Sequence, residues 1–286
     1  MKFTKMHGLG NDFILIDCME RTLPRPSNTS KKLCHRRFGI GADQVLLLHK
    51  SKIADFRMRI FNADGGEVEM CGNGIRCLTK YIWDNKLSSK KNLRIETLAG
   101  IITVERAGNM VRVDMGEPVL EPERIPVNLS QKSKSEDSLL VTRHSSLIID
   151  YPLRISDREF KITCVSMGNP HTIIFVKGID NFPVNHYGPL IENHQIFPKR
   201  TNVEFIQVID AGNIKLRVWE RGSGETMACG TGASAGAAAC HLKGLTGRDI
   251  KVHLPGGELF IEWSGKDNHI YMTGPAVEVF SGDIEL

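Results

Sequence analysis

The sequence predicts an α+β protein of two pseudo-symmetric domains, each built on a largely antiparallel sheet. Its 286 residues correspond to about two domains at roughly one domain per ~150 residues. Hydrophobic residues make up 41% of the chain and charged residues 24%, an ordinary globular composition that excludes a disordered or fibrous protein. The third observation is an internal repeat, which relates the two halves by one fixed offset.

The repeat becomes visible when the chain is aligned with itself at an offset of 158 residues, without gaps. The coinciding pairs are Gly10-Asn11 with Gly168-Asn169, Gln44-Val45 with Asn202-Val203, Gly66-Glu67 with Gly224-Glu225, and Cys71-Gly72-x-Gly74 with Cys229-Gly230-x-Gly232. Because one offset aligns all of these pairs, two halves of similar topology are the simplest explanation.

Each half reads as short strands, a glycine-rich turn, and a helix that begins just after a cysteine. Apolar residues alternate over 56–60, as in a half-buried strand, and the repeat places them on an alternating set at 214–218. Beyond the first cysteine motif, Ile75, Leu78 and Ile82 recur at helical spacing. A strand and a helix therefore flank the motif.

The helix after the second cysteine is rich in alanine and glycine, with Gly232 and Gly236 four residues apart. Glycine inside a helix costs ~1 kcal/mol relative to alanine. The composition therefore indicates a helix backbone packed very close to another element. The alternative is an alanine-rich buried helix without such a contact.

A strand, a glycine and a second strand follow each helix, at 93–105 and at 250–262. Each half then closes near a Gly-Pro stop, at 115–118 and 273–275. We expect one domain over 1–118, together with 276–286, and a second over 119–275. The stretch at 128–146 is polar and charged, as expected of a surface loop or insertion.

Charge and cysteine content limit the functional classes. Lys and Arg number 37 against 33 Asp and Glu, and a net charge of +4 is too small to indicate a nucleic-acid or membrane partner. A small-molecule substrate is expected. No apolar run approaches the ~18 residues of a bilayer span, and the N-terminal stretch lacks a signal-peptide core, which predicts a cytoplasmic protein. Seven cysteines without a CxxC pair favour neither a disulfide scaffold nor a usual zinc site.

Two of the cysteines, Cys71 and Cys229, are candidates for catalysis. Each follows a turn containing Gly and Glu, precedes Gly-x-Gly and stands at a predicted helix start. A helix N-terminus offers unpaired N–H groups and partial positive charge, which lower a thiol pKa. The remaining cysteines are expected in the core: Cys18, Cys34, Cys77, Cys164 and Cys240.

The repeat predicts that the two helix starts face each other across a cleft. A carboxylate held there would receive N–H donors from Gly72-Asn73 and Gly230-Thr231, and its α-carbon would lie between two sulfurs. That geometry suits removal of a proton from one face and delivery to the other. A disulfide would need an oxidising compartment, and a metal would need histidine clustering; the sequence signals neither.

Six stretches now carry a family resemblance. MHGLGNDF, GADQ, FNADGGEVEMCGNGIRC, MGNPH, RTNVEF and ERGSGETMACGTGASA occur in an order and at spacings that resemble the diaminopimelate epimerase family, from Lys2 to Leu286. The related proline racemases are expected to lack MHGLGNDF and RTNVEF, and the phenazine-type isomerases to lack the cysteine pair. The chain departs from the family pattern at Ile75 and Ser234 and in its longer polar stretch.

The resemblance implies a cofactor-independent isomerase that interconverts LL- and meso-2,6-diaminopimelate, in the synthesis of lysine and peptidoglycan precursors. It implies that one cysteine acts as thiolate base and the other as thiol acid, with no metal. It also implies a homodimer, a barrel-like sheet around a central helix in each domain, and a last strand at 276–286 that crosses back to the first domain.

The resemblance also assigns individual residues. Substrate contacts are expected from Asn11, Gln44, Asn62, Asn169, Asn202, Glu220 and Arg221. The reacting carboxylate is expected at Gly72, Asn73, Gly230 and Thr231, and the cysteine ionisation is expected to be biased by His171 and Glu220. For His171 the alternative is a loop histidine fixed by Pro170. A buried substrate group without a partner costs ~1–3 kcal/mol, so a cluster of amides with one arginine suits a diamino dicarboxylate.

Two further functions stay open on the residues alone. The first is a non-catalytic amino-acid-binding protein, although binding needs no pair of thiols. The second is a racemase for another amino acid, against which Arg221 suits a second polar end on the substrate. For Arg221 the alternative is a surface salt bridge with Glu220 or Glu225.

Overall fold

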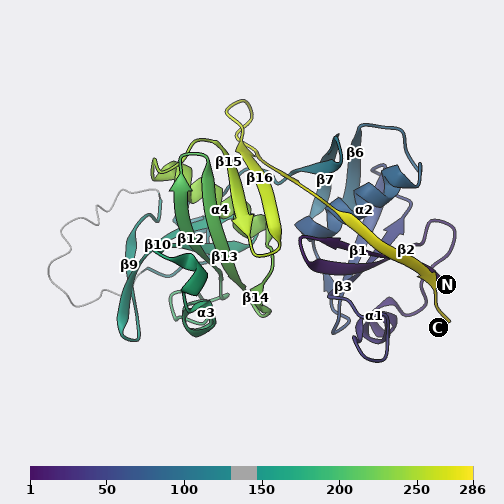
Figure 1. Ribbon diagram of the computed structural model, residues 1–286, viewed down its shortest axis with the longest axis horizontal. Helices are drawn as coiled ribbons and strands as arrows, with labels where there is room; N and C mark the ends of the chain where they lie inside the picture. The colour runs from purple at the N-terminus through teal and green to yellow at the C-terminus, as the bar shows by residue number, and fades with distance from the viewer. Residues whose placement is uncertain (130–146, 286) are drawn as a thin grey trace. The chain divides into compact units, whose positions relative to one another are not determined.

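The computed structural model describes residues 1–129 and 147–285, so most of the polar stretch predicted as a loop lies outside the described residues. The chain forms two compact units (Figure 1). Unit 1 comprises Met1–Asp114 and Tyr271–Leu286, and unit 2 comprises Met115–Ile270. The division into domains at 1–118 with 276–286 and at 119–275 stays a prediction.

Unit 1 contains two α-helices among its strands. Its elements are β1 (Lys2–Gly8), β2 (Asn11–Asp17), α1 (Pro26–Cys34), β3 (Gln44–His49), β4 (Phe56–Asn62), β5 (Glu67–Val68), α2 (Gly72–Asp84), β6 (Asn92–Thr97), β7 (Gly100–Ala107), β8 (Met110–Asp114), β17 (Ile270–Gly274) and β18 (Val277–Asp283). Strands β2 and β3 pair in parallel, as do β4 and β6, whereas β1–β2, β3–β4, β6–β7 and β7–β8 are antiparallel.

Unit 2 repeats this plan. Its elements are η1 (Pro122–Arg124), β9 (Tyr151–Ile155), β10 (Arg158–Ser166), β11 (Pro170–Phe175), η2 (Ile179–Asn181), α3 (Val184–Glu192), β12 (Asn202–Asp210), β13 (Asn213–Glu220), β14 (Gly224–Thr226), α4 (Gly230–Leu242), β15 (Asp249–Leu254) and β16 (Gly257–Trp263). Helices α3 and α4 coincide in both bounds with α1 and α2 at the 158-residue offset. The predicted duplication of topology is confirmed.

A central helix organises each unit. Helix α2 contacts β1, β2, β3, β4, β8 and β18, and α4 contacts β10, β11, β12, β13, β15 and β16. Since strands from both ends of each sheet touch the same helix, each sheet curls around it (Figure 1). Ten of the thirteen residues of each central helix are buried. The predicted α+β fold with a barrel-like sheet around a helix is confirmed.

The close packing predicted for the second helix is also confirmed. A Cβ atom at Gly236 would lie 2.8 Å from Ile206 and 3.0 Å from Leu216, and one at Gly232 would lie 2.7 Å from Glu204. Glycine at these positions therefore allows α4 to approach β12 and β13 closely, and a larger residue would force the neighbouring side chains to shift. Each of these two glycines lowers the helix propensity of α4, and the close packing that it permits offsets that cost.

The C-terminal segment belongs to unit 1. Strand β17 pairs with β8, where Tyr271 lies opposite Asp114, and β18 pairs with β1, where Lys2 lies opposite Asp283. The described helices include none long and apolar enough to cross a membrane.

Candidate active site

In unit 1, polar residues gather at one edge of the sheet. Asn11 and Gln44 begin β2 and β3, which run in parallel, and Asn62 ends the antiparallel β4 directly opposite Gln44. All three predicted residues therefore lie at the same edge. Gln44 Nε2 donates to Asn62 Oδ1 at 2.7 Å, and the buried Gln44 Oε1 has no partner among the described residues. This edge offers an open hydrogen-bond acceptor.

Cys71 caps α2 beside that edge. Its backbone is extended (φ −140°, ψ 115°), and its sulfur accepts a hydrogen bond from the Gly74 amide at 3.4 Å. Asn11 Oδ1 accepts a hydrogen bond from the Cys71 thiol at 3.7 Å and another from Asn73 Nδ2 at 3.3 Å. The bond to Asn11 favours the thiol form. The structure thus brings Cys71, Asn11 and Asn73 together. A helix amide that donates to sulfur favours the thiolate.

Unit 2 repeats the polar edge. His171 in β11 lies opposite Asn202, the first residue of the parallel β12. Asn202 Nδ2 donates to the Pro170 carbonyl at 2.9 Å, and Asn202 Oδ1 accepts from the Arg221 amide at 2.9 Å. Asn202 therefore joins the start of β11 to the turn after β13.

Cys229 caps α4 with an extended backbone (φ −126°, ψ 117°) and is 6% exposed. Its sulfur lies 3.4 Å from Thr231 Oγ1, which in turn accepts from Asn169 Nδ2 at 3.3 Å. Burial raises the pKa of Cys229 well above its ordinary value, and the negative charges of Glu220 and Glu204 raise it further. In the described structure this thiol is held in its protonated form.

His171 forms hydrogen bonds with two side chains, Glu204 and Asn169. Its Nδ1 lies 2.7 Å from Glu204 Oε1 and its Nε2 lies 3.0 Å from Asn169 Oδ1. The side chains of His171 and Glu204 are fully buried. His171 is a strand residue, so the alternative of a loop histidine fixed by its neighbouring proline is wrong. The sequence analysis did not predict Glu204.

Glu220 lies between Thr226 and the cysteine. Thr226 Oγ1 donates to Glu220 Oε1 at 2.6 Å, and the Cys229 thiol also donates to the carboxylate. Burial raises the pKa of Glu220, although both hydrogen bonds oppose that shift. Glu220 is therefore in direct contact with the thiol that it was predicted to influence.

The side chain of Arg221 is exposed and donates one hydrogen bond. One of its guanidinium nitrogens donates to the Lys199 carbonyl at 3.0 Å. Among the described residues it forms no ion pair with Glu220, and Glu225 pairs with Arg217 at 2.7 Å instead. The salt-bridge alternative for Arg221 is wrong.

The other five cysteines are core residues, as expected. They are Cys18, Cys34, Cys77, Cys164 and Cys240, all buried and free. Burial raises the pKa of Cys34, Cys77, Cys164 and Cys240 to about 12, so these thiols stay protonated at neutral pH. Over residues 1–129 and 147–285, no three His, Cys, Asp or Glu side chains are grouped so that they could hold a metal ion.

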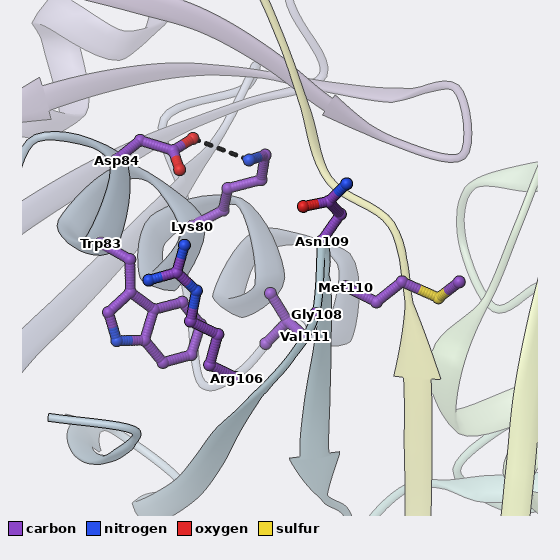
Figure 2. Close-up of a pocket in the computed structure, with 8 residues that line it drawn as sticks. All are labelled: Lys80, Trp83, Asp84, Arg106, Gly108, Asn109, Met110 and Val111. Carbon is purple, nitrogen blue, oxygen red and sulfur yellow. Dashed lines mark hydrogen bonds and ion pairs between the residues drawn. The ribbon is translucent and has the colours of Figure 1, made fainter.

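Figure 2 shows one small pocket of unit 1. It is lined by Lys80, Trp83, Asp84, Arg106, Gly108, Asn109, Met110 and Val111. Lys80 and Asp84 form an ion pair of 2.8 Å there, and Asp84 is the last residue of α2, whereas Cys71 caps its first turn. At 1.5 Å per residue the two ends of this helix are about 18 Å apart. The pocket is therefore separate from the cysteine site.

Solved structures share the fold of this chain. The chain is similar over its full length to a phenazine biosynthesis protein of the PhzF family from Bacillus anthracis, with a TM-score of 0.70 and 18% identity over 99% of that protein. It is similar to a probable proline racemase from Agrobacterium radiobacter K84, with a TM-score of 0.69 and 16% identity over 93% of that protein. At such low identity these likenesses indicate the fold alone.

Sequence relatives are far closer. The chain is 51% identical to proteins named diaminopimelate epimerase from Acetivibrio thermocellus and Methanococcus maripaludis, and 50% identical to one from Moorella thermoacetica. Each likeness covers the whole chain and 99–100% of the relative. The model of the family described as diaminopimelate epimerase matches residues 3–121 and 163–279. The chain therefore belongs to the diaminopimelate epimerase family.

Proposed function

We propose that this protein interconverts LL- and meso-2,6-diaminopimelate by proton transfer between substrate and two cysteines, Cys71 and Cys229. The proposal rests on an arrangement that occurs in both units. Each cysteine caps the central helix of its unit, at equivalent positions of a duplicated fold. Family membership supplies the substrate class. The cysteine pair supplies the chemistry.

The reaction needs one thiolate and one thiol at the same time. The thiolate removes the α-proton from one face of the substrate carbon, and the thiol delivers its proton to the opposite face. The α-carbon inverts, and the two cysteines exchange protonation states. A pair that shares one proton titrates as a coupled unit, so the rate is expected to follow a bell-shaped pH profile.

The first turns of α2 and α4 suit the reacting carboxylate. The first N–H groups of a helix have no partner within it, and the helix dipole favours an anion there. In this proposal Gly72 and Asn73 donate from α2, and Gly230 and Thr231 donate from α4. These donors also stabilise the negative charge that develops beside the α-carbon when its proton leaves.

The amide side chains suit the remaining polar groups of the substrate. Gln44 and Asn62 already pair with each other, and Gln44 retains a buried acceptor without a partner. Substrate ammonium is the natural donor to such an oxygen. Asn11, Asn169, Asn202 and Glu220 complete the polar wall, and Arg221 is proposed to receive the distal carboxylate as a bidentate pair.

His171 and Glu220 are proposed to modulate the cysteines. Glu220 accepts a hydrogen bond from the Cys229 thiol, which favours the protonated cysteine. His171 bridges Glu204 and Asn169, and Asn169 in turn donates to Thr231 beside the sulfur. A change of charge on His171 reaches the sulfur through three hydrogen bonds, from His171 to Asn169, from Asn169 to Thr231 and from Thr231 to Cys229.

The proposal includes a cellular setting. Substrate and product serve lysine and peptidoglycan precursor synthesis, so we propose a cytoplasmic enzyme that uses no added cofactor. A homodimer is proposed on family resemblance. Dialysis against a chelator is expected to leave the rate unchanged, and activity that returns only on addition of a metal or pyridoxal phosphate would contradict the two-thiol reaction.

The decisive experiment compares substrates. Purified protein is incubated with LL-diaminopimelate, L-proline or L-glutamate in D₂O, and inversion and α-deuterium incorporation are followed by chiral chromatography and mass spectrometry. We expect inversion of diaminopimelate alone. Faster inversion of proline or glutamate would identify a racemase for another amino acid. Binding of diaminopimelate with neither inversion nor deuterium incorporation would identify a binding protein.

A further inference from the structure

Arg76 is a fully buried cation in the second turn of α2. Its guanidinium donates to Asn73 Oδ1 at 2.9 Å, to the Pro275 carbonyl at 3.1 Å and to the Gly72 carbonyl at 3.2 Å, and it lies 3.6 Å from Met272 sulfur. All four acceptors are neutral. No carboxylate among the described residues pairs with it, although buried charges are normally paired.

The ionisable groups that interact with the Arg76 charge are Cys77 and Cys71. Burial raises the pKa of Cys77 to about 12, so that thiol stays protonated. Burial lowers the pKa of Arg76 to about 10, so the guanidinium is still charged at neutral pH. Cys71 is therefore the group whose ionised form this cation stabilises.

Arg76 also orients the amides beside that sulfur. Because it donates to Asn73 Oδ1, the amide of Asn73 turns its nitrogen toward Asn11 Oδ1. Asn11 in turn donates to Asp43 Oδ2 at 2.9 Å. The charged groups beyond Asn11 form a compensated cluster of Asp12, Asp43, Lys5 and Arg36. This cluster carries two charges of each sign, so Arg76 supplies the uncompensated charge.

Unit 2 has the opposite charge at its helix start. Ser234 occupies the place of Arg76, where its hydroxyl donates to the Gly230 carbonyl at 2.9 Å. Glu204 occupies the place of Leu46, against the first turn of α4, and a Cβ atom at Gly232 would meet Glu204 Oε1 at 2.7 Å. The second carboxylate oxygen of Glu204 is buried without a partner among the described residues. Its negative charge offsets the positive end of the α4 dipole.

Of the remaining groups around Cys229, Glu220 raises the pKa of the thiol, whereas Thr231 and the Gly232 amide lower it but do not outweigh burial and the two carboxylates. Glu220 from β13 accepts a hydrogen bond from the thiol, and Thr231 from α4 lies 3.4 Å from the sulfur. His171 from β11 hydrogen-bonds Glu204. Both carboxylates raise the pKa of Cys229, in addition to the larger effect of burial. A thiolate is disfavoured there.

We propose that Arg76 and Glu204 are positioning residues that make the two thiols unequal, so that the free enzyme holds Cys71 as thiolate and Cys229 as thiol. This inference rests on the proposed two-thiol reaction. In a turnover from this state, Cys71 removes the α-proton while the C–H electron pair stays on carbon, and Cys229 delivers its own proton to the other face. Cys71 leaves as thiol and Cys229 as thiolate, and proton exchange with solvent restores the resting pair.

The test measures each thiol in the free enzyme without substrate. Alkylation by iodoacetamide is followed against pH, and each cysteine is resolved by peptide mass spectrometry. We expect the wild-type midpoint of Cys71 to lie at least about one pH unit below that of Cys229. Cys77 and Cys240 serve as internal controls that stay unmodified at neutral pH, because burial raises the pKa of each to about 12.

The variants separate charge from packing. Arg76→Gln keeps hydrogen-bonding capacity without charge and is expected to raise the Cys71 midpoint by about one unit, whereas Arg76→Lys restores it. Glu204→Gln is expected to lower the Cys229 midpoint and leave that of Cys71 unchanged. A purely structural role would alter thermal melts without moving either midpoint.

Three outcomes overturn the inference. They are equal or reversed wild-type midpoints, a Cys71 midpoint unmoved in folded Arg76→Gln, and a Cys229 midpoint unmoved in Glu204→Gln. If Arg76→Gln does not fold, the wild-type profile and Glu204→Gln still decide it. Unequal midpoints in a protein that fails to invert diaminopimelate would contradict the proposed function and leave the assigned thiol states standing.

Discussion

The first turns of α2 and α4 are equivalent in backbone and opposite in charge. Both begin after an extended cysteine cap and present Gly-x-Gly. Around Cys71 lies a buried guanidinium without a carboxylate partner among the described residues, and around Cys229 lie two carboxylates. A duplicated fold thus kept the helix starts that suit an anion and changed the charges beside them. The two backbone caps are alike, but the Cys71 sulfur accepts a hydrogen bond from the Gly74 amide and the Cys229 side chain makes no such cap bond.

The largest effect is expected from removal of either sulfur. Cys71→Ala and Cys229→Ala should each lower kcat for diaminopimelate inversion by at least about 10³-fold, because each face of the carbon loses its proton donor or acceptor. Cys240→Ala, a buried core change in α4, is the matched control and should retain activity. The rates are measured by chiral chromatography. Near-full turnover in either cap variant would refute the pairing of the two helix starts.

A smaller loss is expected at Arg221, a cation that unit 2 carries where unit 1 has Ala63. Arg221→Lys should lower kcat/KM by about 10–100-fold, because lysine lacks the planar fork that binds a distal carboxylate in two places. Thermal stability should change little, since the side chain is exposed. Steady-state kinetics and a thermal melt provide the measurements.

Arg200→Lys is the control for that change. Arg200 pairs with Glu192 at 3.1 Å, its side chain is 54% exposed, and an exposed ion pair tolerates lysine. An equal loss of kcat/KM in both variants, or a loss in Arg221→Lys that tracks unfolding, would place the distal carboxylate elsewhere.

Matched glycine substitutions compare the packing at the two helix starts. A Cβ atom at Gly232 would lie 2.7 Å from the Glu204 carboxylate, whereas one at Gly74 would lie 3.0 Å from a methyl group of Leu46. A methyl group can move aside, but the buried carboxylate is held by His171. Gly232→Ala should therefore lower the free energy of unfolding by about 1–3 kcal/mol.

For Gly74→Ala the better helix propensity of alanine, ~1 kcal/mol, should offset most of the crowding and leave the free energy of unfolding nearly unchanged. Urea denaturation of both variants gives the two values. The same loss in both would mean that the carboxylate of unit 2 adapts as readily as the leucine of unit 1.

The smallest effect concerns the ionic support of Asn11 in unit 1. Burial alone would raise the pKa of Asp12, but hydrogen bonds from Arg36 and Lys5 hold it well below its usual range. A carboxylate with a lowered folded-state pKa stabilises the protein above about pH 4 and loses that contribution as the pH falls. Asp12→Asn should cost about 1 kcal/mol at pH 7, after allowance for solvent screening.

The pH dependence distinguishes this contribution from simple packing. The difference between Asp12→Asn and wild type should shrink as the pH is lowered below about 4, because the Asp12 carboxyl of the unfolded chain then becomes protonated while that of the folded protein stays ionised. Denaturation curves at pH 7 and at acidic pH provide the test. A difference that persists unchanged into acid would mean that the ion pairs around Asp12 contribute nothing to stability.

The sequence by itself determined the duplication and the two helix starts. These follow from local signals, namely a fixed offset, a cysteine before Gly-x-Gly, and apolar residues at helical spacing after Cys71. The polar edge residues, such as Asn11 and Asn202, could also be predicted from the sequence. Each stands at a strand end and belongs to a pair of positions that the repeat aligns. Local patterns of this kind need no knowledge of distant neighbours.

Only the tertiary structure decided which charges surround each sulfur. Arg76 follows Ile75 in an apolar helix pattern, and Glu204 stands between two buried residues of β12, yet neither residue's sequence neighbours reveal its partners. The signal was present in the repeat, where Arg76 aligns with Ser234 and Glu204 with Leu46. Its meaning depended on burial and on contacts such as Arg76 with Pro275, which lies far along the chain. Desolvation and pairing decide the effect of a charge, and both are properties of the packed fold.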